Sequence, residues 1–333
     1  MNIDKHEIDR LYRGFNDLTA MVVGDVMIDA YYWGRVDRIS PEAPVPIVQI
    51  TERENRLGGA ANVALNVMSL GAKPIICSVI GNDEKADLFE ALLAKRDFSS
   101  EGIERSSERP TTVKTRIISS DQHLLRVDEE STRALSQAEE TAFIQRCTKV
   151  IESGEVDVLI FEDYNKGLLT EHVISSLISL ARKHNIPVTV DPKKENFFAY
   201  QHATLFKPNF KELVEGVKLD IDKNSDEAII AGIREMESKL SNELSLVTLS
   251  ERGVMVKQGD QVQRIPAHPR KIIDVSGAGD TVISVASLIL ALKGDPAVIA
   301  GMSNLAGGLV CEKVGVVPID KELLFDEVRK NNS

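Results

Sequence analysis

The amino-acid sequence predicts an α/β protein in which helices cover a mostly parallel sheet, and three observations support this fold class. Short apolar runs of strand length alternate with longer segments of helical period along most of the 333 residues. Polar residues directly follow many of the apolar runs, as they do at the ligand-binding edge of an open parallel sheet. Two β-rich segments, 30–50 and 112–128, interrupt this alternation and are predicted to form a small separate sheet.

The N-terminal half begins with a strand expected over residues 19–24, whose end carries Asp25 and then Asp29. Residues 30–50 contain the run Tyr31-Tyr32-Trp33 and three prolines, which is typical of an exposed edge strand. The aromatic run is compatible with a local core, a cover over a ligand, or a dimer surface. Further elements are expected at 56–70 (a helix that Gly71 ends), 74–81 (a strand), 84–97 (a helix) and 111–128 (a hairpin around Ser120-Asp121-Gln122).

The second half resumes the alternation, and its apolar runs also end in polar residues. The chain reads Glu162-Asp163-Tyr164-Asn165 after one run, Asp191 after the next and Lys207-Pro208-Asn209 after a third. Because the carboxyl ends of parallel strands meet at one edge, one ligand site is expected to collect these side chains. The expected strands are 157–161, 187–190, 204–206, 245–249, 253–257 and 261–265, and the expected helices are 136–152, 170–184, 225–240, 295–313 and 320–330.

Residues 272–293 carry the strongest functional signal. The apolar run from Ile272 to Val275 is expected to be a strand or extended chain, followed by a small-residue turn and a helix N-terminus. Free N–H groups and the helix dipole at such an end attract anions such as phosphate. An isolated Gly-x-Gly-Asp is more simply a turn with Asp280 as a helix cap. A carboxylate among anion-binding donors makes chemical sense if it accepts a proton from a nucleophile aimed at that phosphate.

Composition limits the classes of function. The chain has 40 Lys and Arg against 51 Asp and Glu, a formal net charge of −11, so nucleic-acid binding is not expected. The cysteines Cys77, Cys147 and Cys311 are far apart, which favours buried thiols over a disulfide framework or a zinc site. Residues 1–19 lack an apolar signal region and no apolar run reaches membrane-spanning length. We therefore expect a cytoplasmic protein without a membrane partner.

Familiar nucleotide-binding motifs are absent from the sequence. The Lys114-Thr115 pair lacks the glycines of a Walker A loop, and Gly277-Ala278-Gly279 lacks the third glycine of the dinucleotide fingerprint. Neither His-Arg-Asp nor Asp-Phe-Gly occurs, which excludes the protein-kinase motif set. A nucleotide site in this protein must use a different solution.

Two motifs together resemble the two signatures of the PfkB/ribokinase-like carbohydrate kinases. They are Gly58-Gly59-Ala-Ala-Asn62 and Asp274-Val-Ser-Gly-Ala-Gly-Asp280, and the resemblance covers nearly the whole chain. Within this family, the segments VVGDVMID, RISPEAPVPIV and GGAANVALNVMSLGA are most similar to kinases of D-glycero-β-D-manno-heptose 7-phosphate, which are often the N-terminal half of a bifunctional protein. Ser276 stands where Thr is usual, and Glu162 and Asn165 stand where Ser and Ala are usual. The length suggests the kinase half alone.

The resemblance implies a three-layer α/β core in which residues 1–333 form one kinase domain, with 30–50 and 112–128 as a β lid that pairs in a homodimer. It implies ATP-dependent phosphorylation of the anomeric hydroxyl of the heptose 7-phosphate to the 1,7-bisphosphate, for ADP-heptose and lipopolysaccharide core synthesis. The implied cofactors are ATP and Mg²⁺, with a monovalent cation as a further candidate. Alternatives are a family kinase for fructose, ribose, a sugar phosphate or a nucleoside, a non-catalytic sugar or nucleotide sensor, and, from another class, an NAD-dependent oxidoreductase.

The same resemblance assigns roles to individual residues. Asp280 is the implied base that takes the acceptor proton. The amides that would stabilise the transferred phosphoryl group are those of Gly277, Ala278 and Gly279. Glu212 would organise Mg²⁺ through water. The nucleotide would contact Asn209, Glu212, Thr248, Gly253 and Asn304, and the sugar would contact Asp25, Asp29, Gly58, Gly59 and Asn62. A 7-phosphate needs a cation, and the candidates, each equally compatible with a structural role, are Lys166, Lys193, Arg116 and Arg126.

Overall fold

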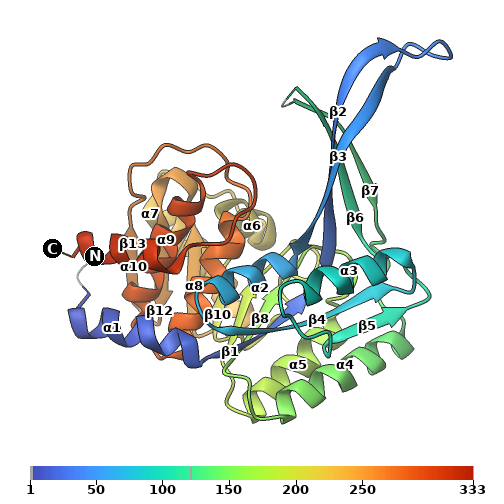
Figure 1. Cartoon of the computed structure of the whole chain (residues 1–333). Helices are drawn as coiled ribbons and strands as arrows, with labels where there is room; N and C mark the ends of the chain where they lie inside the picture. The colour runs from blue at the N-terminus through green and yellow to red at the C-terminus, as the bar shows by residue number, and fades with distance from the viewer. Residues whose placement is uncertain (1–2, 121, 333) are drawn as a thin grey trace.

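The computed structural model describes residues 3–120 and 122–332, and most of its strands belong to one large sheet (Figure 1). In the described residues, the strand order is β13-β12-β11-β10-β9-β8-β1-β4-β5, parallel from β11 to β5 and antiparallel at β12 and β13. These strands are β1 (Thr19–Gly24), β4 (Lys73–Gly81), β5 (Ile103–Ser106), β8 (Val158–Glu162), β9 (Val188–Asp191), β10 (Leu205–Phe206), β11 (Leu244–Thr248), β12 (Val254–Gln258) and β13 (Gln261–Ile265).

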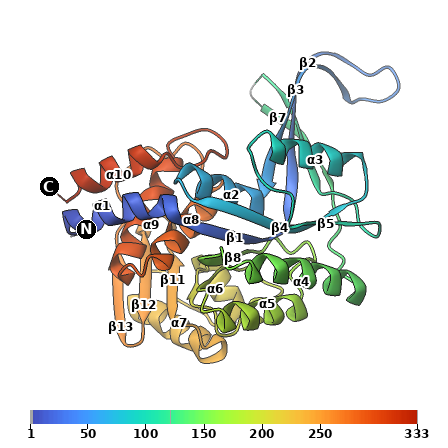
Figure 2. The ribbon, with the colours of Figure 1, turned by 60° about the horizontal axis from the view of Figure 1, so that its bottom comes forward.

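Helices cover both faces of this sheet, which gives three layers (Figure 2). Strand β1 shows why its sequence is continuously apolar: Ala20 and Val22 pack into one core, and Met21 and Val23 pack into the other. One face is covered by α1 (Lys5–Gly14), α2 (Ala60–Ser69), α3 (Glu84–Ala94), α8 (Ala278–Ala291), α9 (Pro296–Val310) and α10 (Lys321–Lys330). The other is covered by α4 (Gln137–Glu152), α5 (Glu171–Lys183), α6 (Phe210–Val217) and α7 (Asp226–Leu240). The predicted α/β fold class is confirmed.

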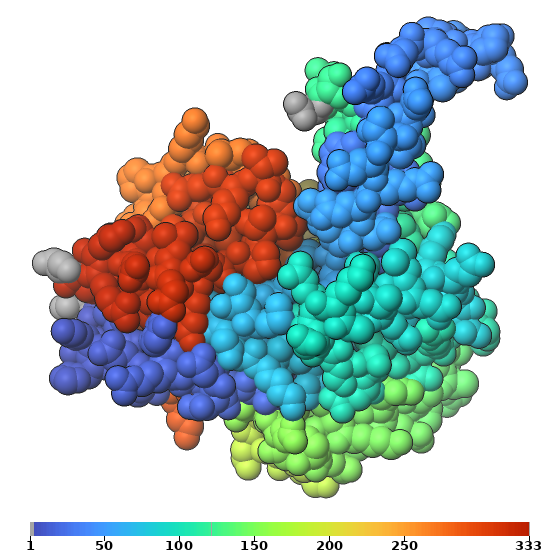
Figure 3. Space-filling view, in the orientation of Figure 1, coloured from blue at the N-terminus to red at the C-terminus, as the bar shows by residue number. Residues whose placement is uncertain are grey.

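A second sheet rises from the main body as a twisted arm (Figures 1 and 3). Its strand order is β3-β2-β6-β7, built from β2 (Val26–Ile39), β3 (Pro46–Gly59), β6 (Val113–Ser119) and β7 (Gln122–Glu129). The small separate sheet predicted from 30–50 and 112–128 is therefore confirmed, although β2 and β3 extend further than expected. Asp121, in the predicted hairpin turn, lies outside the described residues. The role of this sheet as a lid stays a prediction.

The segment before α8 differs from the expected strand. Residues 272–277 join neither sheet, and Ile272, Ile273 and Val275 are 55%, 53% and 69% exposed. Their backbone is held by the chain after α9, because the amides of Ile273 and Asp274 both donate to the Cys311 carbonyl. The strand alternative is wrong and the segment is an irregular loop. A β-branched run without a neighbouring strand to pair with does not form a sheet.

Two elements were not predicted from the sequence. Helix α1 is amphipathic, with Ile8 and Leu11 buried and its charged residues outward, and the Asp4 side chain caps it by accepting from the His6 amide. Strand β5 is short and forms the edge of the large sheet. Two 3₁₀ turns, Phe15–Asp17 and Ser250–Arg252, complete the chain.

In the described part of the chain, no helix has both the length and the apolar character needed to cross a membrane.

Candidate active site

Polar side chains from four parallel strands meet around a cavity of about 540 Å³. The strands contribute their carboxyl ends, so residues far apart in sequence become neighbours: Glu162 of β8 pairs with Asp191 of β9 in the ladder. The start of α6 and the start of α8 complete the wall. The lining residues are Glu162, Tyr164, Asp191, Lys193, Lys207, Asn209, Phe210, Lys211, Glu212, Lys223, Thr248, Ser250, Val275, Gly279 and Asp280. The sequence expectation of one site at the strand ends agrees with this arrangement.

Asp280 lies in the first turn of α8 and is only 7% exposed. The Tyr164 hydroxyl donates to its Oδ1 at 3.2 Å, and the Asn62 side chain is close enough to favour the ionised form of the carboxylate. Burial and the nearby Asp191 charge raise the pKa of Asp280 to about 6, while the hydrogen bond from Tyr164 opposes the rise. A carboxylate with such a pKa is ionised at neutral pH and still holds a proton better than an exposed one.

A buried ion pair lies beneath the start of α8. Lys207 Nζ is 2.7 Å from Asp191 Oδ2, and both side chains are almost fully buried. Burial alone would lower the pKa of Lys207, but the charges of Asp191 and Glu212 raise it, so the ammonium stays charged. A Cβ added to Gly279 would lie 3.4 Å from Asp191 Oδ2 and 3.8 Å from Lys207 Nζ, which places this pair against the helix end.

Glu162 is a second buried acid in this wall. It is 1% exposed, and its Oε2 is buried without a hydrogen-bond partner in the described residues. Burial, Asp191 and Asp280 raise the pKa of Glu162 well above its usual value. Protonation of Glu162 therefore relieves the repulsion among three neighbouring acids.

The predicted anion-binding turn lies at the N-terminus of α8. Gly277 is the residue before the helix, with φ 77°, a conformation that favours glycine. The helix begins at Ala278, so Gly279 and Asp280 occupy its first turn. The Ala278 amide donates to the Val275 carbonyl at 3.3 Å. The interpretation of Asp280 as a helix cap is not supported, because it lies inside the helix.

Asn209 and Glu212 form a capping box at the start of α6. The Asn209 side chain accepts from the Glu212 amide at 2.9 Å, and the Glu212 side chain accepts from the Asn209 amide at 2.8 Å. Glu212 also pairs with Lys193 at 2.7 Å. Burial alone would lower the pKa of Lys193, but Asp191 and Glu212 raise it. In the described ranges, no group of three or more acidic, His or Cys side chains is arranged to hold a metal ion.

The three remaining nucleotide candidates occupy two places. Thr248 ends β11 and lines the cavity. Gly253 and Asn304 lie outside that lining but converge on the segment 265–267: a Cβ on Gly253 would come within 2.0 Å of the Ile265 carbonyl, and Asn304 donates to the Pro266 carbonyl at 2.9 Å. The structure thus brings Gly253 and Asn304 together, and Gly253 also lies beside Thr248, because Thr248 pairs with Val254 and the Leu249 amide donates to the Gly253 carbonyl at 2.7 Å.

Asp25 is committed to the backbone of the loop that follows β8. Its carboxylate accepts from the amides of Tyr164 and Lys166 at 3.1 Å and of Leu168 at 3.4 Å. Burial raises its pKa, and these amide donors oppose the rise. A structural role for Asp25 as the anchor of this loop is therefore evident, and its contact with a sugar stays a prediction.

The Gly58-Gly59 pair allows close approach of other groups. A Cβ on Gly58 would lie 2.3 Å from Asp29 Oδ2, and one on Gly59 would lie 2.3 Å from the Asp25 carbonyl. Gly59 has φ 62° and directly precedes α2. Both glycines therefore lie beside the two acids predicted to bind sugar.

One face of the small sheet carries several cations. In the strand register, Asp29 of β2 lies opposite Arg56 of β3, and Arg116 of β6 lies opposite Arg126 of β7, so these side chains are on the same face. Arg116 forms an ion pair with Asp29, and both Arg56 and Arg116 lie over the Tyr31 ring. We call this the inner face because Arg56 lies near Gly315, in the loop that holds Asp274. Arg56 was not predicted. The signal that could have shown it is strand alternation, which places Arg56 of β3 on the face opposite to Arg53.

The other cation candidates have partners in the described residues. Lys166 pairs with Glu130 at 2.7 Å, and Arg126 pairs with Asp128 at 2.9 Å while its side chain remains 58% exposed. Lys193 is the candidate that lines the cavity itself. Four further residues line the cavity that the sequence placed at the strand ends without giving them a role: Glu162, Tyr164, Asp191 and Lys207. Their signal was their position directly after apolar runs.

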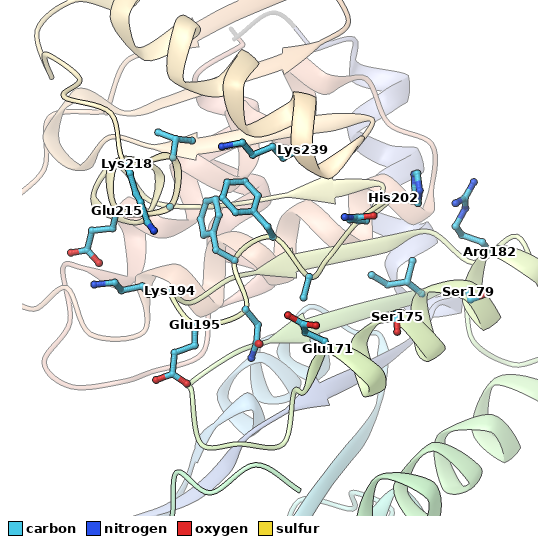
Figure 4. Close-up of a pocket in the computed structure, with 18 of the residues that line it drawn as sticks. Glu171, Ser175, Ser179, Arg182, Lys194, Glu195, His202, Glu215, Lys218 and Lys239 are labelled. Atoms are coloured by element: carbon cyan, nitrogen blue, oxygen red, sulfur yellow. The ribbon is translucent and has the colours of Figure 1, made fainter. Parts of the chain in front are cut away.

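A larger groove of about 1330 Å³ lies between α5, the segment 194–202 and the end of α6 (Figure 4). Its charged side chains, among them Arg182, Lys194 and Lys218, are exposed and spread over different elements. None of the predicted site residues lines it. The smaller cavity is the candidate active site because Asn209, Glu212, Gly279 and the buried acids converge there.

Comparison with known proteins gives relatives along the whole chain. The bifunctional protein HldE of Citrifermentans bemidjiense is 37% identical over 329 residues, covering 98% of this chain and 66% of the relative. HldE of Koribacter versatilis is 40% identical over 314 residues, covering 92% and 63%. HldE of Pseudomonas aeruginosa is 39% identical over 318 residues, covering 95% and 65%. The chain spans just under two thirds of the length of these relatives.

Solved structures confirm the ribokinase-like fold. The tetrameric inhibited form of phosphofructokinase-2 from Escherichia coli matches with a TM-score of 0.75 at 18% identity, covering 94% of this chain and 99% of that one. Arabidopsis thaliana ribokinase complexed with ribose and ATP matches with a TM-score of 0.68 at 15% identity, covering 93% and 97%. The sequence also matches the pfkB family of carbohydrate kinases over residues 17–322. The chain therefore belongs to the pfkB family of carbohydrate kinases, as its two motifs predicted.

Proposed function

We propose that this carbohydrate kinase transfers the γ-phosphoryl group of ATP to the anomeric hydroxyl of D-glycero-β-D-manno-heptose 7-phosphate. The product would be the 1,7-bisphosphate, for ADP-heptose and lipopolysaccharide core synthesis in the cytoplasm. The observation that carries the kinase chemistry is Asp280, a buried carboxylate at the N-terminus of α8 that opens into the 540 Å³ cavity. The choice of acceptor rests on the resemblance to heptose 7-phosphate kinases and on the similarity to HldE proteins.

In the proposed reaction, Asp280 accepts the proton of the sugar hydroxyl while the oxygen of that hydroxyl bonds to the γ-phosphorus. The bond between the γ-phosphorus and the bridging oxygen breaks, and ADP leaves with the bonding electron pair. The amides of Gly277, Ala278 and Gly279, with the positive end of the α8 dipole, would stabilise charge on the transferred group. The raised pKa of Asp280, about 6, makes it a better base than an exposed Asp.

The donor set suits a Mg²⁺ ion held mainly by phosphates and water. Glu212 offers carboxylate oxygens at the cavity wall, but the described residues supply no ready cluster of three ligands. Mg²⁺ binds in this way in many phosphoryl-transfer sites, and when bound it neutralises phosphate charge. Asn209 and Thr248 would contact the nucleotide in the cavity, and Gly253 and Asn304 would contact it near the segment 265–267. A monovalent cation remains a further proposed cofactor.

The inner face of the small sheet is proposed to hold the sugar phosphate. Arg116 is partly buried and forms an ion pair with Asp29, and Arg56, which pairs with Glu54, packs on the same Tyr31 ring from the neighbouring strand, so two guanidinium groups lie on this face. Guanidinium groups bind phosphate well because two N–H groups can meet two oxygens. Asp29, Gly58 and Asn62 at the base of this sheet would contact the sugar hydroxyls. Lys166, Lys193 and Arg126 remain candidates for the same phosphate.

We also propose that residues 1–333 act as one kinase domain and that two copies pair through the small sheet. The face opposite the inner one carries apolar side chains that are left in solvent, including Leu125 and Val127. We call it the outer face. Exposed apolar patches on a sheet are typical of protein–protein contacts.

An acceptor screen tests the proposed substrate. ADP release would be measured with heptose 7-phosphate, the same heptose without phosphate, fructose, fructose 6-phosphate, ribose and a nucleoside. We expect heptose 7-phosphate to give the highest kcat/KM, and NMR of the product to show the new phosphate on the anomeric carbon. A higher kcat/KM for another acceptor would replace the proposed substrate, and no ADP release with any acceptor would favour a sensor over a kinase.

A further inference from the structure

We propose that Tyr164 is a positioning residue that fixes the carboxylate of Asp280 for proton transfer. This inference rests on the proposed function, because it concerns the base of that reaction. Its direct observation is the hydrogen bond of 3.2 Å from the Tyr164 hydroxyl to Asp280 Oδ1 across the cavity wall. The two residues are separated by 116 positions in the sequence, so no local pattern pairs them.

The loop that carries Tyr164 is held rigidly. Asp25 binds three of its backbone amides, including that of Tyr164. Asp163 accepts from the Asn165 amide at 2.7 Å and from the Tyr200 hydroxyl at 2.8 Å. The buried carboxylates of Asp25 and Asp163 thus organise the loop, and the Tyr164 side chain is presented to α8 in a fixed direction.

The phenol of Tyr164 acts only as a donor toward Asp280. Burial and the carboxylates of Asp280, Glu162 and Asp191 raise the pKa of Tyr164 well above its usual value, so it keeps its proton. A hydrogen bond to the ionised carboxylate favours that form and opposes the effects of burial and of Asp191. Tyr164 therefore keeps Asp280 both oriented and unprotonated, which are the two requirements of a general base.

Tyr164 also connects the base to the other side of the cavity. The Lys193 ammonium lies 6.0 Å from the centre of the Tyr164 ring and pairs with Glu212 at 2.7 Å. The groups that surround Asp280 and Tyr164 come from separate elements: Asn62 from α2, Glu162 from β8, Asp191 from β9, and Lys207 after β10. The Tyr164 hydroxyl donates a hydrogen bond to the Asp280 carboxylate, and the Asn62 side chain also favours its ionised form.

Tyr164→Phe removes the hydroxyl and keeps the ring that Lys193 faces. We expect kcat to fall by about 10–100-fold, the loss typical of a hydrogen bond to a charged group. The KM values for ATP and sugar should change less than about threefold, because the ring and the binding residues remain. The acid limb of the kcat/KM profile should move to higher pH, because Asp280 loses a donor that favours its ionised form.

Tyr12→Phe is a matched control, since the Tyr12 hydroxyl also donates to a carboxylate, Glu322, but on the surface between α1 and α10. It should leave kcat and the acid limb unchanged. The kinetics use whichever acceptor the wild-type enzyme phosphorylates, so a wrong choice of sugar affects only the proposed function. Wild-type kcat and an unmoved acid limb in Tyr164→Phe would overturn the inference, and so would a fall in kcat without a shift of that limb.

A second measurement needs no acceptor. Ionisation of a buried carboxylate lowers folding stability as pH rises, and the loss is larger without the donor. The Tm of Tyr164→Phe should therefore fall further between pH 5 and pH 8 than that of the wild type or of Tyr12→Phe. Parallel Tm profiles for Tyr164→Phe and the wild type would contradict an action through Asp280, whatever the enzyme phosphorylates.

Discussion

At the scale of single residues, burial gives Asp280 the properties that a general base needs. An exposed Asp has a pKa of about 3.9 and would be a weak base for a hydroxyl. Burial and Asp191 raise the pKa of Asp280 to about 6, and Tyr164 and Asn62 limit the rise. The surroundings of Asp280 thereby bring its pKa closer to neutral pH. The same surroundings lower the stability of the folded protein when Asp280 ionises.

Asp280→Asn is expected to abolish turnover while ATP and sugar still bind, and to stabilise the unliganded fold. The folded pKa of about 6 lies above the unfolded value, so protonation favours the folded state. Ionisation of Asp280 in the folded state lowers the free energy of unfolding. This loss is absent below about pH 4 and complete above about pH 7, where we expect Asp280→Asn to raise the free energy of unfolding by roughly 1–3 kcal/mol. Urea unfolding at both pH values, calorimetric binding and an ADP-release assay measure these effects.

Two results would contradict these expectations separately. Retained turnover in Asp280→Asn would exclude the role of Asp280 as base. An equal free energy of unfolding for both proteins at high pH would exclude the cost assigned to its ionisation. Loss of binding with loss of turnover would assign Asp280 to substrate binding instead.

The residue scale also shows what the sequence could predict. The Gly-Ala-Gly-Asp motif and the capping pair Asn209–Glu212 are local in sequence, and the structure places them at one cavity. The neighbours of Asp280 are not local: Tyr164, Asp191 and Lys207 follow three different strands. Their meeting depends on the strand order of the large sheet, which no single segment encodes.

At the scale of elements, strand alternation divides the small sheet into two chemically different faces. Asp29, Tyr31 and Arg116 belong to the inner face, while Tyr32 and Leu125 belong to the outer one. The sequence predicted this sheet but not the direction in which each face points. That direction follows from the proximity of Arg56 to Gly315.

Arg116→Met tests the proposed phosphate contact of the inner face. It keeps an unbranched side chain and removes the guanidinium, so we expect the KM for the sugar phosphate to rise by about 10–100-fold, as for a lost charged hydrogen bond. The kcat/KM for the heptose without phosphate should change little. Steady-state kinetics with both sugars give the ratio that decides the point.

Arg53→Met is the matched control for this prediction, because Arg53 lies opposite Tyr32 in the strand register and its guanidinium packs on the Tyr32 ring, on the outer face. It should leave the preference for the phosphorylated sugar intact. If Arg116→Met keeps the same preference, the phosphate is bound elsewhere, and Lys193 and Lys166 become the next residues to change.

Helices and strands were predicted well where the folded protein supplies a partner for them, and less well where it does not. The strand ending in Asp25 and the helix after Gly59 are found close to the predicted positions. Residues 272–275 have a strand-like pattern but no partner strand, and the carbonyl of Cys311 holds them as a loop. Helix α1 was missed because its apolar residues are few, although Ile8 and Leu11 are buried.

At the scale of the whole molecule, the small sheet projects from the three-layer body (Figure 3). Its inner face lies toward the loop of Gly315, whose amide donates to Asp274, and its outer face exposes Leu125 (56%) and Val127 (42%). A projecting sheet with one apolar face in solvent is incompletely covered by its own chain. Pairing of two outer faces would bury these side chains and steady both inner faces over their active sites, which joins assembly to sugar binding.

Leu125→Glu is therefore expected to dissociate a homodimer. A carboxylate placed in a paired apolar face loses its hydration without gaining a partner, a cost of several kcal/mol per interface. Light scattering after size-exclusion chromatography should give the dimer mass for the wild type and the monomer mass for the variant, whose KM for the sugar should rise. Leu219→Glu, at an exposed apolar position of the main body (44% exposed), should remain dimeric. A monomeric wild type, or a Leu125→Glu variant with unchanged mass, would show that the outer face does not pair.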